Sequence, residues 1–403
     1  MSAATDTPAF DVCGPLPRGI TVLEASAGTG KTYTIAGLAA RYVADGIPLE
    51  RLLVVTFTRN ATSELRDRVR ERLVSAEEGL EAVLAGGNVP LGEDVLALLA
   101  DGTDAEVEQR RARLQAALAD FDAATIVTTH GFCQAVLEGL GIAGDLEPDV
   151  TFVEDVRDLV DEVVDDLYVR RFQGEAHPPF DRAQAGEIAR AAAVRNPTAP
   201  LDPADLDGDT PAALRRRLAE AVRIEVERRK RRLGVMTYED LLTRLEAALN
   251  GPAGDAIARR LRDRYEVVLV DEFQDTDPTQ WAIMRRAFGA EGCTLVLIGD
   301  PKQAIYAFRG ADVFAYLAAK DAATAHATLD VNRRSDGPLL AAYDALFGNA
   351  QLGHPGIAYR AGRPGPANRQ ARLAGAPECA ALRLRVVERD RIRTTPGGYA
   401  HTD

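Results

Sequence analysis

Hydrophobic residues along this chain fall into short, nearly continuous runs separated by long polar and mixed stretches. Five such runs, all rich in β-branched residues, cover residues 20–23, 52–57, 125–128, 267–270 and 294–298. Continuous apolar runs of this length are typical of strands covered on both faces, as in a parallel sheet. Helical patterns follow most of them, for example at residues 32–43 and 61–73. The repeated order of strand and then helix predicts an α/β fold.

Two long segments separate the predicted strands. Residues 75–120 and 138–262 are rich in Ala, Leu, Glu and Arg, and their patterns predict helices. A loop rich in Pro, Asp and Gly is expected near residues 196–211 of the second segment. The chain is therefore expected to leave its sheet twice and to return to it each time.

Composition places the chain among ordinary globular proteins. Its 403 residues predict about two to three domains, and 46% are hydrophobic and 27% charged. No apolar run approaches the roughly 20 residues of a membrane span, and no secretory signal is visible. The four cysteines are scattered without metal-ligand or disulfide spacing. We therefore expect no membrane partner and a reducing, cytoplasmic setting.

The net charge of −13 does not by itself favour a nucleic-acid partner. Binding depends on a local basic footprint rather than on net charge, and local basic runs exist. They comprise Arg66, Arg68, Arg70 and Arg72; Arg228, Arg229, Lys230, Arg231 and Arg232; and an arginine-rich stretch after Arg360. Taken singly, each is first interpreted as a solvated helix face.

The stretch EASAGTGKT, residues 24–32, follows an apolar strand and precedes a helix. This is the context of a phosphate-binding loop, in which backbone N–H groups at a helix start face an anion. Only four lysines occur in this arginine-rich chain, so a lysine here is unusual. We expect Lys31 to bridge the β- and γ-phosphates of ATP and Thr32 to bind Mg²⁺. The predicted ATP-binding residues are Ala25, Ser26, Ala27, Gly28, Thr29, Gly30, Lys31 and Thr32, with Ala25 replacing the usual first glycine.

A second motif, DEFQDTD at residues 271–277, follows another apolar strand. Carboxylates at the end of a parallel strand are expected beside the phosphate-binding loop. Asp271 is expected to hold Mg²⁺, and Glu272 to activate the attacking water. An adjacent acidic pair favours hydrolysis, whereas a kinase takes the proton from its own acceptor.

A third motif, IGDPKQAIYAFRGAD at residues 298–312, combines an amide with aromatic residues. Gln303 can hydrogen-bond both a γ-phosphate and a water molecule. Tyr306 and Phe308, followed by Arg309, suit stacking on unpaired bases and contact with phosphate. The alternative is that the two aromatic side chains belong to the core.

Together, EASAGTGKT, TFTRNATSELRDRV, TTHGFCQ, VDEFQDTD and IGDPKQAIYAFRGAD resemble the ordered motifs of UvrD/Rep-type superfamily 1 DNA helicases. Their residues, together with RRLGVMTYEDLL at residues 231–242, are most similar to those of the RecB family. The resemblance implies a RecA-like P-loop NTPase sheet with helical insertions. It also implies an ATP- and Mg²⁺-dependent 3′-to-5′ DNA helicase subunit in double-strand-break and recombinational repair, with RecC- and RecD-like partners.

The resemblance also assigns further site residues. Thr56, Phe57, Thr58, Arg59, Asn60, His130, Tyr306, Phe308 and Arg309 match positions that bind DNA in the family. In LDVNRRS, Arg334 matches the arginine that reaches the γ-phosphate. Arg333 stands where the family usually has an aromatic residue that stacks on adenine, and no glutamine occurs before Gln109 to recognise adenine.

The resemblance implies a domain order as well. Residues 1–74, 121–137 and 263–328 are expected to form the first motor domain, 1A. Residues 75–120 are expected to be a helical insertion, and 138–262 the helical subdomain 1B. Residues 329–403 are expected to begin a truncated second motor domain and to end in an Arg-, Gly- and Pro-rich tail. The family's late motifs and the nuclease domain of RecB proteins are not found.

Two hypotheses stay open at this point. The chain is either a helicase motor subunit, its missing motor domain supplied by another chain, or a motor-dead fragment. The fragment would bind nucleotide and single-stranded DNA or a partner without unwinding. An unrelated phosphotransferase is rejected because Arg59, Asn60 and the aromatic pair would have no role in it.

Overall fold

The computed structural model describes residues 7–140, 150–153, 155–195, 200–202, 208–305, 311–348, 350–372 and 381–384. Tyr306, Phe308 and Arg309 therefore lie outside the described residues, as do parts of the loop at 196–211 and most of the tail. The chain divides into two compact units. The first consists of Met1–Val127, Arg262–Trp281 and Phe288–Asp403, and the second of Thr128–Leu261 and Ala282–Ala287. The domain boundaries given above stay predictions.

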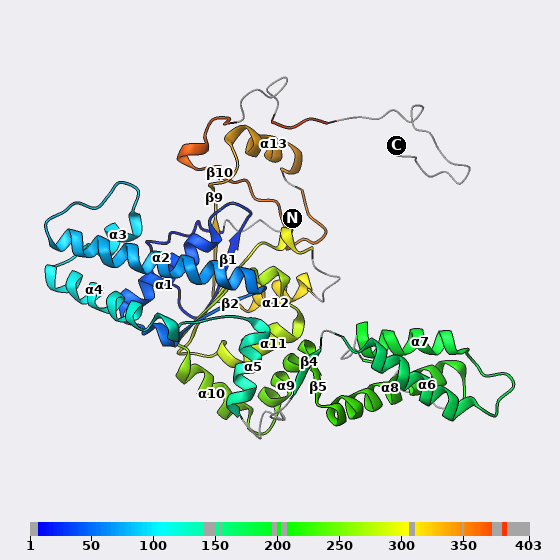
Figure 1. Cartoon of the computed structure of the whole chain (residues 1–403). Coiled ribbons are helices and arrows are strands. Elements are labelled where there is room, and N and C mark those ends of the chain that lie inside the picture. Colours follow the sequence, from blue (N-terminus) through cyan, green and yellow to red (C-terminus); the bar gives the residue numbers. More distant parts are fainter. Residues whose placement is uncertain are drawn as a thin grey trace. The chain divides into compact units, whose positions relative to one another are not determined.

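A six-stranded sheet forms the centre of the first unit (Figure 1). Its strands, in spatial order, are β3 (Thr125–Thr128), β2 (Leu52–Thr56), β6 (Val267–Val270), β7 (Thr294–Gly299), β1 (Ile20–Ala25) and β8 (Ala325–Leu329). The pairs β2–β6, β6–β7, β7–β1 and β1–β8 are all parallel. The predicted parallel α/β fold is confirmed, and each of the five predicted strands is present.

Strand β8 was not predicted. Its sequence, AHATL, is too polar to be recognised as a buried strand, and its residues are partly or fully exposed at the edge of the sheet. Its outer side hydrogen-bonds through Thr328 to the backbone of Pro8 and Phe10, and a strand at the edge of a sheet needs less apolar character than a central strand.

Four helices pack together on one face of the sheet: α1 (Lys31–Asp45), α2 (Arg59–Leu84), α3 (Asp94–Leu99) and α4 (Asp104–Ala119). Figure 1 shows them grouped, coloured from blue to cyan. Alternate strand residues such as Leu23, Val54 and Leu269 are fully buried in one core with these helices. Burying a Leu or Val side chain contributes about 1.5–3 kcal/mol, so this face anchors the loops at the strand ends.

Alternating residues such as Val268 and Val270 point to the other face of the sheet. There, Phe273 contacts the rings of Trp281 and Tyr316. These rings belong to the short helix η5 (Phe273–Asp275) and to α11 (Pro278–Phe288) and α12 (Val313–Ala322). The remaining elements of this unit are η1 (Leu49–Arg51), η2 (Phe121–Ala123), η6 (Pro301–Gln303), β9 (Val331–Asn332), α13 (Gly337–Phe347), β10 (Arg363–Pro364) and η8 (Pro366–Asn368).

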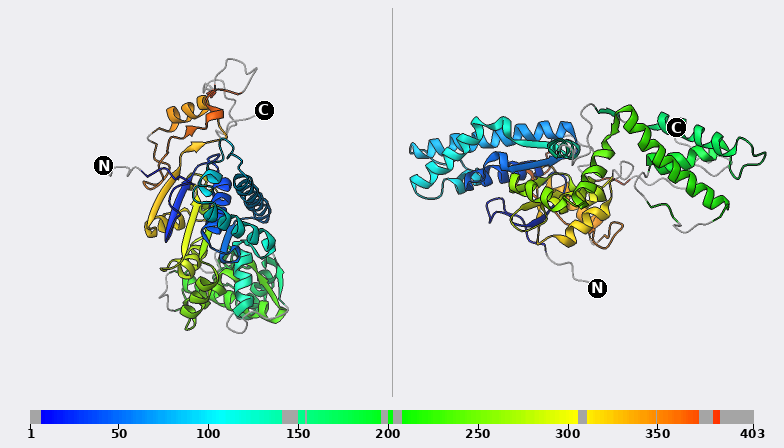
Figure 2. Two further views of the ribbon diagram at one scale, coloured as in Figure 1. Left: turned by 90° about the vertical axis from the view of Figure 1, so that its left-hand side faces the viewer. Right: turned by 90° about the horizontal axis from the view of Figure 1, so that it is seen from below.

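The second unit is mainly helical. Helices α6 (Arg157–Phe172), α7 (Arg182–Arg190) and α8 (Pro211–Leu233) pack around a separate apolar core and lie side by side in Figures 1 and 2. Helix α5 (Thr129–Leu140) packs on α9 (Tyr238–Asn250), beside the parallel pair β4 (Thr151–Val153) and β5 (Val235–Thr237). The other elements are the π-helix η4 (Ala191–Arg195) and α10 (Gly254–Arg264). Within the described residues, no helix is long and apolar enough to span a bilayer.

Candidate nucleotide-binding site

The phosphate-binding loop joins β1 to α1 through two glycines in left-handed conformations. The φ angles of Gly28 and Gly30 are 81° and 91°, values that a residue with a Cβ rarely adopts. Thr29 closes the turn by donating from its backbone N and its Oγ1 to the Ser26 carbonyl oxygen, at 3.2 Å and 2.7 Å. Helix α1 begins at Lys31, so its first N–H groups lack helical partners and can bind an anion.

Ala25 explains why the first glycine of the usual pattern is dispensable here. It is the last residue of β1, is completely buried, and pairs with Leu329 of β8. Its backbone is extended, so the conformational freedom of glycine is not required at this position. The residue that differs from the usual pattern therefore lies at the end of the strand, before the turn of the loop.

The acidic pair lies at the carboxyl end of β6. Lys31 pairs through its ammonium group with the Glu272 carboxylate, and the Glu272 backbone N donates to Asp271 Oδ1 at 2.9 Å. Among the described non-glycine residues, Glu272 alone has a positive φ, at 51°. Strained conformations of this kind persist where the surroundings impose them, often at functional sites. This backbone bend directs Glu272 toward the phosphate-binding loop.

Gln274 connects the acidic motif to the third motif. Its Nε2 donates to Glu272 Oε2 at 2.8 Å, and its Oε1 accepts from the Asp300 backbone N at 2.9 Å. Gln303 then donates through Nε2 to Asp300 Oδ2 at 2.8 Å. One continuous chain of hydrogen bonds thus links Lys31, Glu272, Gln274, Asp300 and Gln303.

Sequence reasoning did not assign a role to Gln274. The sequence shows an amide between acidic residues in DEFQDTD. One hydrogen-bond partner of that amide, Asp300, lies at the end of another strand. Gln274 is only 2% exposed, and a Cβ added to Gly299 would lie 2.7 Å from its Oε1. Gly299 therefore leaves the space through which the amide reaches Asp300.

The carboxyl groups of Asp271, Glu272 and Asp275 lie close together beside the loop. Burial, together with the neighbouring Glu272 carboxylate, raises the pKa of Asp271 to about 6 and that of Asp275 to about 6. Asp275 Oδ1 is buried without a hydrogen-bond partner among the described residues. Uncompensated carboxylate oxygens of this kind fit a hard divalent cation, and Mg²⁺ is commonly held by one or two carboxylates together with phosphate oxygens. Asp271 and Thr32 stay the predicted Mg²⁺ ligands, and Asp275 lies close to the same acidic pair.

The NRRS segment is fixed directly onto the phosphate-binding loop. Asn332 Nδ2 donates to the Ala27 carbonyl oxygen at 3.0 Å, and the Arg333 backbone N donates to the Gly28 carbonyl oxygen at 2.7 Å. A Cβ on Gly28 would lie 2.5 Å from Arg334 Cβ, so only glycine permits this approach. The predicted residues Arg333 and Arg334 are thus anchored beside the loop with exposed side chains.

A buried charge cluster lies next to this site and was not predicted. Lys302 Nζ lies 2.8 Å from Glu24 Oε1 and 2.7 Å from Asp300 Oδ1, and Arg360 Nε lies 3.1 Å from Glu24 Oε2. Burial alone raises the pKa of the Glu24 carboxyl, but Lys302 and Arg360 outweigh it and hold that pKa below its usual range. The cluster ties β1, η6 and the segment after α13 together.

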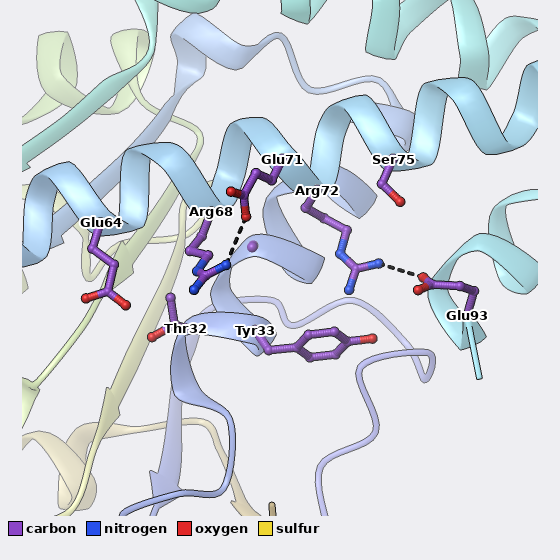
Figure 3. Close-up of a pocket in the computed structure, with 9 residues that line it drawn as sticks. Thr32, Tyr33, Glu64, Arg68, Glu71, Arg72, Ser75 and Glu93 are labelled. Atoms are coloured by element: carbon purple, nitrogen blue, oxygen red, sulfur yellow. Dashed lines mark hydrogen bonds and ion pairs between the residues drawn. The ribbon is translucent and has the colours of Figure 1, made fainter.

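We expect Lys302→Met to reduce the free energy of unfolding by about 1–3 kcal/mol, because it leaves two buried carboxylates short of a partner. Urea denaturation measures this loss. Arg68→Met is the control, since the exposed Arg68 guanidinium pairs with one exposed carboxylate, that of Glu71, at 3.0 Å (Figure 3). Equal losses in the two variants would show that the charge cluster has no special stabilising role.

The predicted DNA-binding residues Thr56, Phe57, Thr58, Arg59 and Asn60 lie where β2 ends and α2 begins. Thr56 is buried and hydrogen-bonds Thr62 Oγ1 at 2.6 Å, and Thr58 caps α2 by accepting from the Ala61 backbone N at 3.2 Å. Arg59 and Asn60 are exposed. Because β2 pairs with β6 in parallel, this segment and the acidic pair share one edge of the sheet. Thr56 and Thr58 shape the turn, and Arg59 and Asn60 are available to a ligand.

His130 lies on α5 in the second unit. Its ring packs edge-on against Tyr238 with centroids 5.7 Å apart, and Tyr238 stacks on Phe152 at 5.7 Å. Burial lowers the pKa of His130 below its usual range, which favours the neutral ring. A neutral ring supports hydrogen bonding rather than charge attraction. Tyr238 and Phe152 were not predicted as site residues.

The basic runs have partners within the protein. Arg66 donates to the carbonyl oxygens of Ala124 and Phe121, and Arg72 pairs with Glu93 at 3.0 Å. In the second run, Arg228 and Arg229 pair with Glu225, and Lys230 is buried against Asp240. Both runs therefore contact other parts of the protein, and Lys230, which is 5% exposed, does not lie on a solvated face as expected.

Comparison with known proteins agrees with the geometry. Residues 12–324 match the family model described as the UvrD/REP helicase N-terminal domain. RecBCD enzyme subunit RecB of Mycobacterium tuberculosis (strain ATCC 25618 / H37Rv) is 48% identical over 94% of the chain, and that of Mycolicibacterium smegmatis 49% over 94%. The Escherichia coli (strain K12) subunit is 30% identical over 82%. The chain spans 34–38% of the length of these relatives.

The family model covers well over half of the chain and includes the loop, the acidic motif and the third motif. The resemblance drawn from these motifs is confirmed, whereas the roles of individual residues stay predictions. The chain belongs to the UvrD/Rep helicase family.

Proposed function

We propose that this chain is the ATP-hydrolysing motor portion of a RecB-type 3′-to-5′ DNA helicase subunit in double-strand-break and recombinational repair. The observation that carries the proposal is the hydrogen-bonded chain from Lys31 through Glu272, Gln274 and Asp300 to Gln303. It joins the ends of three strands that a triphosphate would contact together. The cytoplasm, where the DNA substrate lies, is the proposed setting.

In this mechanism the triphosphate lies against the N–H groups at the start of α1. Lys31 exchanges its contact with Glu272 for phosphate oxygens, which leaves the carboxylate able to accept a proton from the attacking water. Gln274 holds that carboxylate in place while Lys31 moves. Bound Mg²⁺ would neutralise charge on the phosphates, held by Thr32 and Asp271.

The DNA contacts are proposed at the same edge of the sheet. Arg59 and Asn60 are exposed there and suit a phosphodiester backbone, and Gln303 connects the nucleotide side to the aromatic stretch that follows it. Tyr306, Phe308 and Arg309 remain proposed base contacts, and His130 a backbone contact. RecC- and RecD-like subunits are the proposed protein partners.

A steady-state ATPase assay with and without single-stranded oligodeoxythymidine tests the proposal. We expect DNA to stimulate hydrolysis several-fold, because nucleotide and DNA residues share one edge of the sheet. Lys31→Ala supplies the background rate. Nucleotide binding without any stimulation would contradict the motor function and favour the alternative of a motor-dead binding fragment.

A further inference from the structure

Asp300, the residue directly after β7, decides which way the amide of Gln303 faces. Asp300 is 2% exposed, and its Oδ2 accepts a hydrogen bond from Gln303 Nε2 at 2.8 Å. An ionised carboxylate can only accept, so the amide turns its NH₂ group toward Asp300. The second N–H of that group is then free for a γ-phosphate oxygen, and Oε1 is free to accept from a water molecule.

The backbone of Asp300 orients a second amide, that of Gln274. The Asp300 backbone N–H can only donate, and it donates to Gln274 Oε1 at 2.9 Å. The NH₂ group of Gln274 is thereby turned toward Glu272 Oε2, at 2.8 Å. One buried residue therefore orients both the amide beside the proposed general base and the amide of Gln303.

Lys302 supplies the cation that the Asp300 carboxylate needs in its buried position. The Lys302 ammonium lies 2.7 Å from Asp300 Oδ1 and 2.8 Å from Glu24 Oε1, and the lysine side chain is only 13% exposed. Burial by itself lowers the pKa of Lys302, but Glu24 and Asp300 outweigh it and raise that pKa, so the ammonium stays charged. Arg360 holds Glu24 from the other side, at 3.1 Å.

We propose that Lys302 is a positioning residue for hydrolysis, acting through Asp300 to hold the amide of Gln303 in its working orientation. The inference rests on the proposed function, because it requires Gln303 to act on a bound triphosphate. A buried carboxylate that lacks a cation binds a proton more readily, and a protonated carboxyl group both donates and accepts. Without Lys302, Asp300 therefore admits either orientation of the Gln303 amide.

Steady-state ATPase titrations over Mg-ATP concentration, without DNA, test the proposal. We expect Lys302→Met to lower kcat by about 10- to 100-fold, the scale of misplacing a reacting group by roughly 1 Å. KM is expected to stay within about threefold of the parent's, since the phosphate-binding loop is unchanged. Asp300→Asn, which is neutral and of the same shape, is expected to reproduce the loss in kcat. Lys302→Arg, which keeps the charge, is expected to turn over faster than Lys302→Met.

Two comparisons separate positioning from a loss of stability. If Lys302 acts through Gln303, then Lys302→Met lowers kcat no further in a Gln303→Ala background, whereas independent effects multiply. Lys230→Met is the matched control, because Lys230 is also a buried lysine between two carboxylates, those of Glu227 and Asp240, but belongs to the second unit. Its kcat is expected to equal the parent's although its thermal stability falls.

The outcomes distinguish this inference from the proposed function. An unchanged kcat in Lys302→Met would overturn the positioning role, as would equal kcat losses in Lys302→Met and Lys230→Met. A further loss in the double variant with Gln303→Ala would also overturn it. Each of these results leaves the proposed function standing. A parent chain that does not hydrolyse ATP would overturn both.

Discussion

Lys31→Ala is expected to weaken Mg-ATP binding by about 100-fold or more. The substitution removes the ammonium group that would contact the phosphates, and contacts to charged groups contribute about 1.5–3 kcal/mol each. It also leaves the Glu272 carboxylate, now paired with Lys31, without its cation. An unpaired carboxylate beside the loop repels a triphosphate. The two effects act in the same direction, which makes this the largest expected change in binding.

Calorimetric titration with Mg-ATP measures this change directly. Lys320→Ala is a suitable control because Lys320 is a partly buried lysine on α12, outside the proposed nucleotide contacts. A dissociation constant for Lys31→Ala within a few-fold of the parent value would remove Lys31 from its proposed role. Thermal unfolding of the variant separates a loss of binding from a loss of folding.

Glu272→Gln is expected to reduce turnover by about 10²- to 10⁴-fold while Mg-ATP binding persists. A positioned general base contributes a factor of this size, and an amide cannot accept the proton of the attacking water. The amide oxygen can still accept the hydrogen bond from Gln274, so the geometry of the site is expected to survive. The variant therefore separates proton transfer from binding.

Single-turnover hydrolysis and a parallel binding titration measure the two effects. Glu266→Gln provides the control, since Glu266 lies at the amino end of the same strand and pairs with Arg51 on the surface. Equal hydrolysis rates in Glu272→Gln and the parent would show that another group accepts the proton. A parallel loss of binding would instead assign Glu272 a structural role.

Much of the local structure followed from neighbouring residues. Continuous apolar runs predicted the central strands, and the strand-loop-helix context of EASAGTGKT predicted the phosphate-binding loop. The carboxylates after the strand at 267–270 were expected beside the loop because parallel strands end at one edge. These features depend on residues close together in the chain, where periodicity and backbone preference act.

Other parts of the site could not be predicted in this way. Lys302 and Glu24 are 278 residues apart, and Arg360 and Glu24 are 336 apart. No local pattern pairs such residues. Strand β8 was missed because, as an edge strand, it lacks a continuous apolar run. Gln274 was overlooked because its role depends on a gap left by Gly299 on a neighbouring strand.

By itself, the sequence determined the α/β class, the nucleotide-binding motifs and the family. Tertiary structure alone decided which residues meet: Gln274 with Asp300, Lys302 with Glu24, and Arg360 with Glu24. The physical reason is that backbone propensities and hydrophobic periodicity act over a few residues, whereas ion pairs and stacked side chains depend on strand order and packing between distant segments.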